Sequence, residues 1–115
     1  MNENTFLDVT ERIKNEIKKT DVVIFMKGTP VFPMCGFSAS TVQILTNLGI
    51  KFNSVNVLDS DEMREGIKQF TNWPTIPQVY VKEEFIGGCD IIKEMYESGE
   101  LLELLNSRGI EVKPS

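Results

Sequence analysis

An unbroken run of five apolar residues, VVIFM at Val22–Met26, most restricts the folds that this chain can adopt. Such a strand is apolar on both faces, so it belongs in the centre of a sheet that is covered on both sides. Apolar residues at helical spacing over 36–48 and a second strand-like segment over 52–57 follow it. A strand, a helix and a strand in this order predict a parallel pair with a right-handed crossover.

The segments on either side of this unit predict two more helices. Over 5–19, apolar residues recur every three or four positions. Thr5 with Asp8 matches the capping-box pattern, so we expect the first helix to begin there. Over 59–70, acidic residues come first, where they favour the positive end of the helix dipole, and apolar residues form the inner face.

The second half of the chain predicts a hairpin followed by two helices. The hairpin turn at Lys82 and Glu83 lacks the Gly or Asn that two-residue turns prefer. Gly87 and Gly88 are expected to end the hairpin, and Asp90 to cap the next helix. The predicted ranges are strands 78–81 and 84–86 and helices 91–98 and 100–106. We therefore expect an α/β fold with a small mixed sheet flanked by helices on both sides.

Length and charge exclude several classes of protein. The 115 residues, 1–115, are the size of a single domain. The 12 basic and 17 acidic residues give a formal net charge of -5 without a cluster of Lys and Arg, so we expect no nucleic-acid binding. No apolar run reaches the roughly 18 residues of a membrane span, and the start, MNENTFLD, lacks the pattern of an export signal. We expect no membrane association and a cytoplasmic location.

The thiol chemistry of the chain centres on Cys35. The sequence contains no histidine, which excludes Ser/His and Cys/His catalytic pairs. Cys35 directly precedes the helix over 36–48, where free backbone N–H groups and the helix dipole favour the thiolate. Lys27 can add positive charge, and Gly36 leaves room for another molecule to approach. The alternative is a buried structural cysteine, a common role for a free thiol.

Four short motifs give this cysteine a context. They are KGTP at 27–30, PMCGFS at 33–38, WPTIPQVYV at 73–81 and GGCDI at 87–91. Together they resemble the monothiol glutaredoxins of the CGFS class, over a core of about 5–105. The resemblance implies a thioredoxin-like (glutaredoxin) fold with a four-stranded mixed sheet. Ser38 stands where a second cysteine would complete a C-x-x-C pair, so a dithiol cycle within this motif is excluded.

The resemblance also implies two cofactors, glutathione and a [2Fe-2S] cluster. Such a cluster takes four ligands, commonly thiolates. One Cys35 from each chain of a homodimer and two glutathione molecules would supply them. Cys35 is therefore both the expected catalytic residue and the expected metal ligand. The residues implied to bind glutathione are Lys27, Gly36, Phe37, Arg64, Thr75, Ile76, Pro77, Gly88, Cys89 and Asp90.

The implied contacts differ along the glutathione molecule, which is a tripeptide. Lys27 and Arg64 would bind the glycine carboxylate through charge-assisted bonds, although Arg64 could instead be a solvated surface residue. The Ile76–Pro77 bond would be cis, with the backbone of Ile76 paired to the cysteine moiety. The start of the helix after Gly88 would hold the γ-glutamyl end.

Three side chains keep more than one interpretation. Phe37 is either rim packing or a wall of the cluster site. Trp73, which opens the loop of the Ile76–Pro77 bond, is a candidate for core packing alone. Cys89 is a packed thiol, a backbone contributor, or a resolving partner that forms a disulfide with Cys35. The sequence does not choose among these.

Two functions from different classes follow from the resemblance. The first is a carrier that transfers its cluster to iron-sulfur acceptor apoproteins, with BolA-type proteins as partners. The second is a glutathione-dependent thiol-disulfide oxidoreductase in which Cys35 attacks a glutathionylated protein. An adaptor with a vestigial site is a third. The missing second cysteine in the motif favours the carrier.

Overall fold

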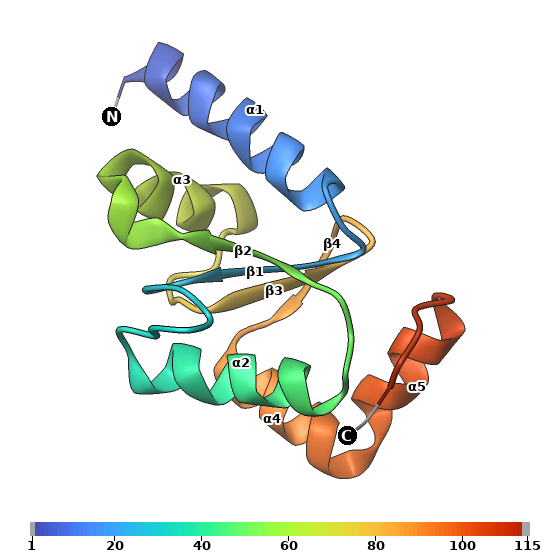
Figure 1. Ribbon diagram of the computed structural model, residues 1–115. Helices are drawn as coiled ribbons and strands as arrows, with labels where there is room; N and C mark the ends of the chain where they lie inside the picture. The colour runs from blue at the N-terminus through green and yellow to red at the C-terminus, as the bar shows by residue number, and fades with distance from the viewer. Residues whose placement is uncertain (1, 114–115) are drawn as a thin grey trace.

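The structure is a computed structural model that describes residues 2–113, and its centre is a four-stranded sheet (Figure 1). The strand order is β2-β1-β3-β4. The fully buried strand β1 (Val22–Met26) pairs in parallel with β2 (Asn53–Asn56) and antiparallel with β3 (Gln78–Val81). Strand β4 (Glu84–Gly87) lies antiparallel to β3 at the other edge. The predicted mixed sheet and parallel crossover are confirmed.

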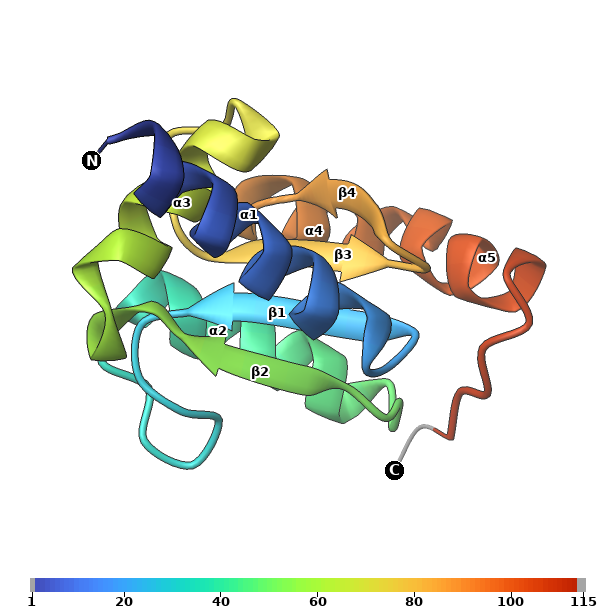
Figure 2. The ribbon, with the colours of Figure 1, turned by 90° about the horizontal axis from the view of Figure 1, so that it is seen from above.

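Helices cover both faces of the sheet. Helices α1 (Glu3–Lys18) and α3 (Asp61–Thr71) lie on one face, and α2 (Gly36–Asn47) and α4 (Cys89–Ser98) lie on the other, as Figures 1 and 2 show. Helix α5 (Glu100–Ser107) follows α4. The side chains of β1 alternate between the two layers. Val22, Ile24 and Met26 join the core under α2 and α4, and Val23 and Phe25 join the core under α1 and α3.

Two predicted helix starts on the α1 and α3 face are wrong by about two residues. Helix α1 is capped by Asn2, whose Oδ1 accepts the N–H of Thr5 at 2.8 Å, so Thr5 and Asp8 do not form its cap. Asn is as good an N-cap as Thr, and a cap at Asn2 makes the helix longer at its N-terminus. Helix α3 is capped by the Ser60 hydroxyl, after a single 3-10 turn at Val57–Asp59.

The start of α4 also differs from the prediction. The helix begins at Cys89 with Gly88 as its N-cap, and Asp90 lies inside the first turn, so Asp90 is not the cap. The strand before it extends through Gly87, one residue beyond the predicted end. A Cβ on Gly87 would lie 2.7 Å from Ile91 Cγ2 and 2.8 Å from its Cβ. Close packing of α4 on β4 therefore requires glycine within the strand.

The hairpin between β3 and β4 forms although its turn lacks glycine. Lys82 and Glu83 both have positive φ, 51° and 69°, as a two-residue hairpin turn of the favoured type requires. Lys82 is held from outside the turn, because its N–H donates to the Asp21 carbonyl at 2.7 Å and its Nζ lies 3.0 Å from Asp21 Oδ1. Contacts from the segment before β1 thus help a turn whose own residues disfavour it.

The chain after α5 packs back onto the fold. Ile110 belongs to the core beneath α2, and the N–H of Lys113 donates to the carbonyl of Leu48 at 3.0 Å. Gly49 adopts a left-handed conformation after α2, with φ 64°. Its missing side chain leaves space for the Lys113 carbonyl, which a Cβ would overlap. Within residues 2–113, no helix is long and apolar enough to cross a membrane.

Candidate functional site

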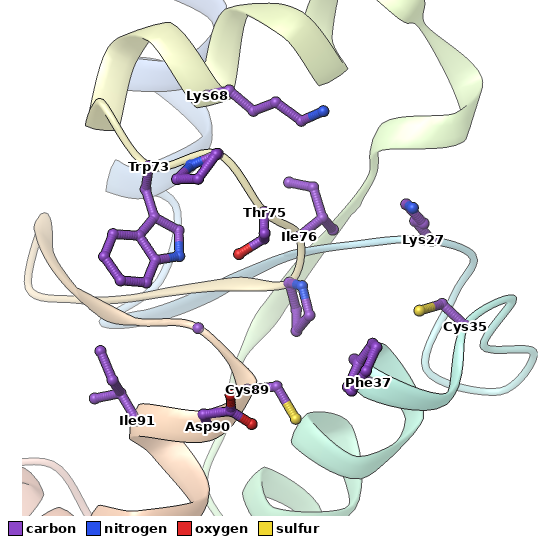
Figure 3. A pocket seen from close by; sticks show the side chains of 13 residues that line it. Lys27, Cys35, Phe37, Lys68, Trp73, Thr75, Ile76, Cys89, Asp90 and Ile91 are labelled. Atoms are coloured by element: carbon purple, nitrogen blue, oxygen red, sulfur yellow. The ribbon is translucent and has the colours of Figure 1, made fainter.

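A cleft of about 430 Å³ lies where α2, α4 and the loop between α3 and β3 meet (Figure 3). Cys35 stands on one side of it and the first turn of α4 on the other, with the loop over 73–77 between them. The lining residues are Lys27, Cys35, Phe37, Lys68, Trp73, Pro74, Thr75, Ile76, Pro77, Gly88, Cys89, Asp90 and Ile91. Three segments that are far apart in the sequence thus build one site.

Cys35 is the N-cap residue of α2, and its surroundings favour the thiolate form of its side chain. Its pKa lies below the ordinary cysteine value chiefly because the backbone N–H of Ser38 stabilises the thiolate. Partial burial acts in the opposite direction, and the Phe37 N–H, the Lys27 charge and the Ser38 hydroxyl add to the lowering. The predicted thiolate at a helix N-terminus therefore agrees with the local geometry.

Ser38 has a structural role beside Cys35 that was not predicted from the sequence. Its side chain is fully buried, and its Oγ accepts the N–H of Lys27 at 3.1 Å. That bond leaves the hydroxyl proton available to the sulfur of Cys35, in keeping with the lowered pKa. A serine in place of a second cysteine thus ties the end of β1 to the start of α2.

The loop over 28–34 sets the position of Cys35. Gly28 has φ 91°, and a Cβ there would overlap the backbone of Phe32. The N–H of Gly28 donates to Asn56 Oδ1 at 2.9 Å, and the N–H of Met34 donates to the Lys27 carbonyl at 2.9 Å. The loop is fixed at its base, and it protrudes beside β1 and β2 in Figure 2.

The opposite side of the cleft is the N-terminus of α4. Gly88 caps the helix without a side-chain hydrogen bond, so the first N–H groups of the helix are free to bind an acceptor. A Cβ on Gly88 would lie 3.2 Å from the Pro77 carbonyl and 3.3 Å from Trp73 Nε1. Cys89 and Asp90 complete this wall, and neither Cys89 nor Cys35 is in a disulfide.

The floor of the cleft is the loop before β3. The Ile76–Pro77 peptide bond is cis, as the resemblance implied. The Trp73 ring packs against Phe85 with ring centroids 5.8 Å apart, so Trp73 has a packing role as well as a place in the cleft. Within residues 2–113, the buried Nε1 of Trp73 has no hydrogen-bond partner.

Lys27 and Lys68 bring positive charge to the lining of the cleft, and Arg64 does not line it. Arg64 points its guanidinium at acidic neighbours on its own helix, with Nη2 3.3 Å from Asp61 Oδ1. Lys68 lies four residues later on α3, and Figure 3 shows its side chain extending over the cleft. Sequence reasoning missed Lys68. The spacing of four residues from Arg64, one helical turn, was the available signal.

Phe37 and Gly36 stand at the rim. Phe37 lines the cleft and is 63% exposed. Gly36 does not line it, and nothing lies within 4 Å of a Cβ built there, so the space beside Cys35 is open on this side. In the described part of the chain, no three His, Cys, Asp or Glu residues are grouped to hold a metal ion.

Comparison of sequences gives one family and several relatives. The glutaredoxin family model matches residues 22–86. The chain is 54% identical over 101 residues to the mitochondrial monothiol glutaredoxin-5 of Saccharomyces cerevisiae, covering 85% of this chain and 67% of the relative. It is 53% identical over 101 residues to a probable monothiol glutaredoxin 2 of Rickettsia typhi, covering 88% and 91%. A mitochondrial glutaredoxin-related protein 5 of Danio rerio is 54% identical, and the chain spans 65% of its length.

Solved structures agree with the fold. The solution structure of a monomeric truncated mutant of Trypanosoma brucei 1-C-Grx1 superposes with a TM-score of 0.83 and 40% identity, covering 92% of this chain and 96% of that one. Reduced apo GrxS14 of poplar gives a TM-score of 0.78 with 46% identity, covering 87% and 92%. Because the yeast and zebrafish relatives are named as mitochondrial, the cytoplasmic location stays a prediction.

Proposed function

The chain belongs to the glutaredoxin family and is similar throughout most of its length to monothiol glutaredoxins, and on that premise we propose that it is a glutathione-dependent carrier of a [2Fe-2S] cluster. The observation that carries the proposal is the place of Cys35, the single cysteine of its motif, as the N-cap of α2 at the edge of a cleft that Lys27, Lys68 and Asp90 also line. The cluster is the cargo, and iron-sulfur acceptor apoproteins receive it.

The cleft suits an extended tripeptide with a charge at each end. Lys27 and Lys68 offer cations for the glycine carboxylate, in charge-assisted bonds. At the other end, the free N–H groups of α4 suit the γ-glutamyl carboxylate, and Asp90 suits its amine. The backbone of Ile76 would pair with the central cysteine moiety, which brings the glutathione sulfur towards Cys35.

Arg64 keeps only an indirect part in this proposal. Its pairing with Asp61 keeps it at the surface of α3, where it contributes positive charge to the approach of an anionic ligand. Thr75 and Pro77 shape the floor of the cleft. In this proposal the backbone N–H of Cys89, in the first turn of α4, is one of the donors to the γ-glutamyl carboxylate.

A shared cluster needs a second copy of the chain. Each Cys35 supplies one thiolate and each glutathione another, which makes the four ligands that such a cluster takes. Four exposed apolar side chains surround Cys35 in the sequence: Val31, Phe32, Met34 and Phe37 are 88%, 74%, 65% and 63% exposed. A homodimer formed around the cluster would cover them, as would a BolA-type partner or an acceptor that replaces one copy.

Anaerobic reconstitution with iron, sulfide and glutathione tests the carrier. We expect visible cluster absorption and a dimer on size exclusion, both dependent on glutathione. Cys35→Ser should lose both, while Cys89→Ser should keep them because the backbone N–H of residue 89 is unchanged. Cluster absorption that persists in Cys35→Ser, or that never forms in the unaltered protein, would refute the proposal.

The rival function uses the same ionised thiol. The Cys35 thiolate would attack the glutathione sulfur of a mixed disulfide and release the protein thiolate. A second glutathione thiolate would then attack that sulfur, releasing glutathione disulfide and regenerating Cys35. Turnover coupled to glutathione reductase separates the two functions. Fast turnover without cluster transfer to an apoprotein would favour the oxidoreductase, and the reverse would favour the carrier.

A further inference from the structure

Gln78, the first residue of β3, lies directly behind the floor of the cleft. Its side chain is fully buried in the centre of the molecule. The Nε2 group donates to the carbonyl of Trp73 at 3.2 Å and to the carbonyl of Thr75 at 3.3 Å. Both partners are acceptors, so they require the NH₂ end of the amide at this place and determine its orientation. Gln78 itself does not line the cleft.

The other end of the amide faces an aromatic cluster. Its Oε1 accepts the hydroxyl of Tyr80 at 3.5 Å, a long contact, and the Tyr80 ring packs against Phe25, Phe70 and Phe85. Burial raises the pKa of Tyr80, so its hydroxyl keeps its proton and remains a donor. The amide thus has partners at both ends in surroundings that are otherwise apolar.

A buried amide of this kind has a cost that an apolar residue would avoid. A polar group without partners in an apolar environment is destabilising, and two loop carbonyls left without donors would be as well. The loop over 73–77 has a turn of irregular backbone that no strand pairs. Gln78 hydrogen-bonds two backbone carbonyls of this loop from the central sheet, in addition to the packing of the Trp73 ring on Phe85.

We propose that Gln78 is a positioning residue, which holds the carbonyls of Trp73 and Thr75 so that Thr75, Ile76 and Pro77 face the ligand. The proposal rests on the proposed function in taking glutathione as that ligand. Gln78 makes no contact with it. Loss of the two hydrogen bonds leaves the loop backbone less firmly held, and binding must then order it before the Ile76 backbone can pair with the tripeptide.

The chain carries its own reporter for this loop, because Trp73 is its only tryptophan. Gln78→Met keeps the length of the side chain and removes both donors. We expect it to weaken glutathione binding by about tenfold, the loss that goes with two neutral hydrogen bonds. We also expect a shift of the Trp73 emission and greater quenching by acrylamide. Gln78→Asn, which is too short to reach both carbonyls, should behave in the same way.

Ile17→Val is the matched control. It trims a buried core side chain on α1 that does not line the cleft, and it lowers stability while the Gln78 hydrogen bonds stay in place, so fluorescence and glutathione affinity should stay as in the unaltered protein. If both Gln78 variants fold and keep the affinity and the Trp73 emission of this control, the positioning role is refuted. If the unaltered protein fails to bind glutathione, the proposed function fails, and the fluorescence comparison alone decides whether Gln78 holds the loop.

Discussion

At the scale of single residues, the reactivity of Cys35 is a property of what surrounds its sulfur. The backbone N–H of Ser38 is the main cause of the lowered pKa, and it depends only on Cys35 being the N-cap residue of α2. The charge of Lys27 is a smaller cause that comes from the end of another element. The two causes can be separated, because only the second can be removed by changing a side chain.

The first prediction therefore concerns the pH dependence of alkylation at Cys35. Because only the thiolate reacts, a lowered pKa means that the rate stays near its maximum to lower pH than for an ordinary cysteine. Lys27→Gln removes a stabilising positive charge, so the pKa of Cys35 rises and the rate profile shifts to higher pH. Iodoacetamide labelling in a Cys89→Ser background measures this.

Lys68→Gln is the control for that shift. Lys68 lines the same cleft, but its charge is not among the causes of the lowered pKa. Its profile should coincide with that of the parent protein. A profile for Lys27→Gln that is unmoved, or moved to lower pH, would contradict the assignment.

At the scale of elements, the ends of the helices decide how segments connect. Helix α2 ends at Asn47, and Gly49, two residues later, has a left-handed backbone that turns the chain towards β2 and also lets the 110–113 segment pack close by. Helix α4 ends in Gly99, which is also left-handed, with φ 87°, but nothing lies within 4 Å of a Cβ built there. The two glycines share a conformation and differ in their surroundings.

Alanine at these two glycines separates backbone strain from overlap. Gly99→Ala should cost about 1–2 kcal/mol in the free energy of unfolding, from the left-handed conformation alone. Gly49→Ala should cost more, by about 1–3 kcal/mol, since its Cβ would also overlap the Lys113 carbonyl and displace the packed segment. Urea denaturation of the two variants measures the difference. An equal decrease in the free energy of unfolding for the two variants would mean that the 110–113 segment moves aside at no cost in free energy.

At the scale of the whole molecule, the apolar side chains of the protruding loop extend the surface around the cleft. Val31 and Phe32 stand outside the packed core, although apolar residues make up both layers of that core. Their exposure is costly in water unless a partner covers them. In the proposed carrier, that partner is the second copy that shares the cluster.

The corresponding prediction is that Phe32→Asp weakens the cluster-loaded dimer and leaves the monomer intact. Because Phe32 is 74% exposed, the change should alter the free energy of unfolding by less than about 0.5 kcal/mol. Size exclusion after reconstitution should show a larger monomer fraction. Leu7→Asp, at a 55% exposed site on α1, is the matched control and should dimerise as the parent does. Equal behaviour of the two variants would rule out the loop as the dimer contact.

Local sequence patterns determined the elements and the place of the reactive thiol. The buried run at Val22–Met26 predicted the central strand, and Cys35 before a helix predicted a stabilised thiolate. These features succeed from sequence because they depend on neighbours a few residues away, whose spacing and conformational preferences act in any fold. The cis bond at Ile76–Pro77 was implied by the family resemblance and not by local preference, because X–Pro bonds are trans in most cases.

Tertiary structure alone decided which side chains meet. The rotation of α3 against the sheet turned Lys68 instead of Arg64 to the cleft. The bonds from Gln78 to the loop carbonyls join a strand to an irregular segment. Such contacts depend on how elements lie against one another, because a short stretch of chain encodes its own conformation but not what packs upon it.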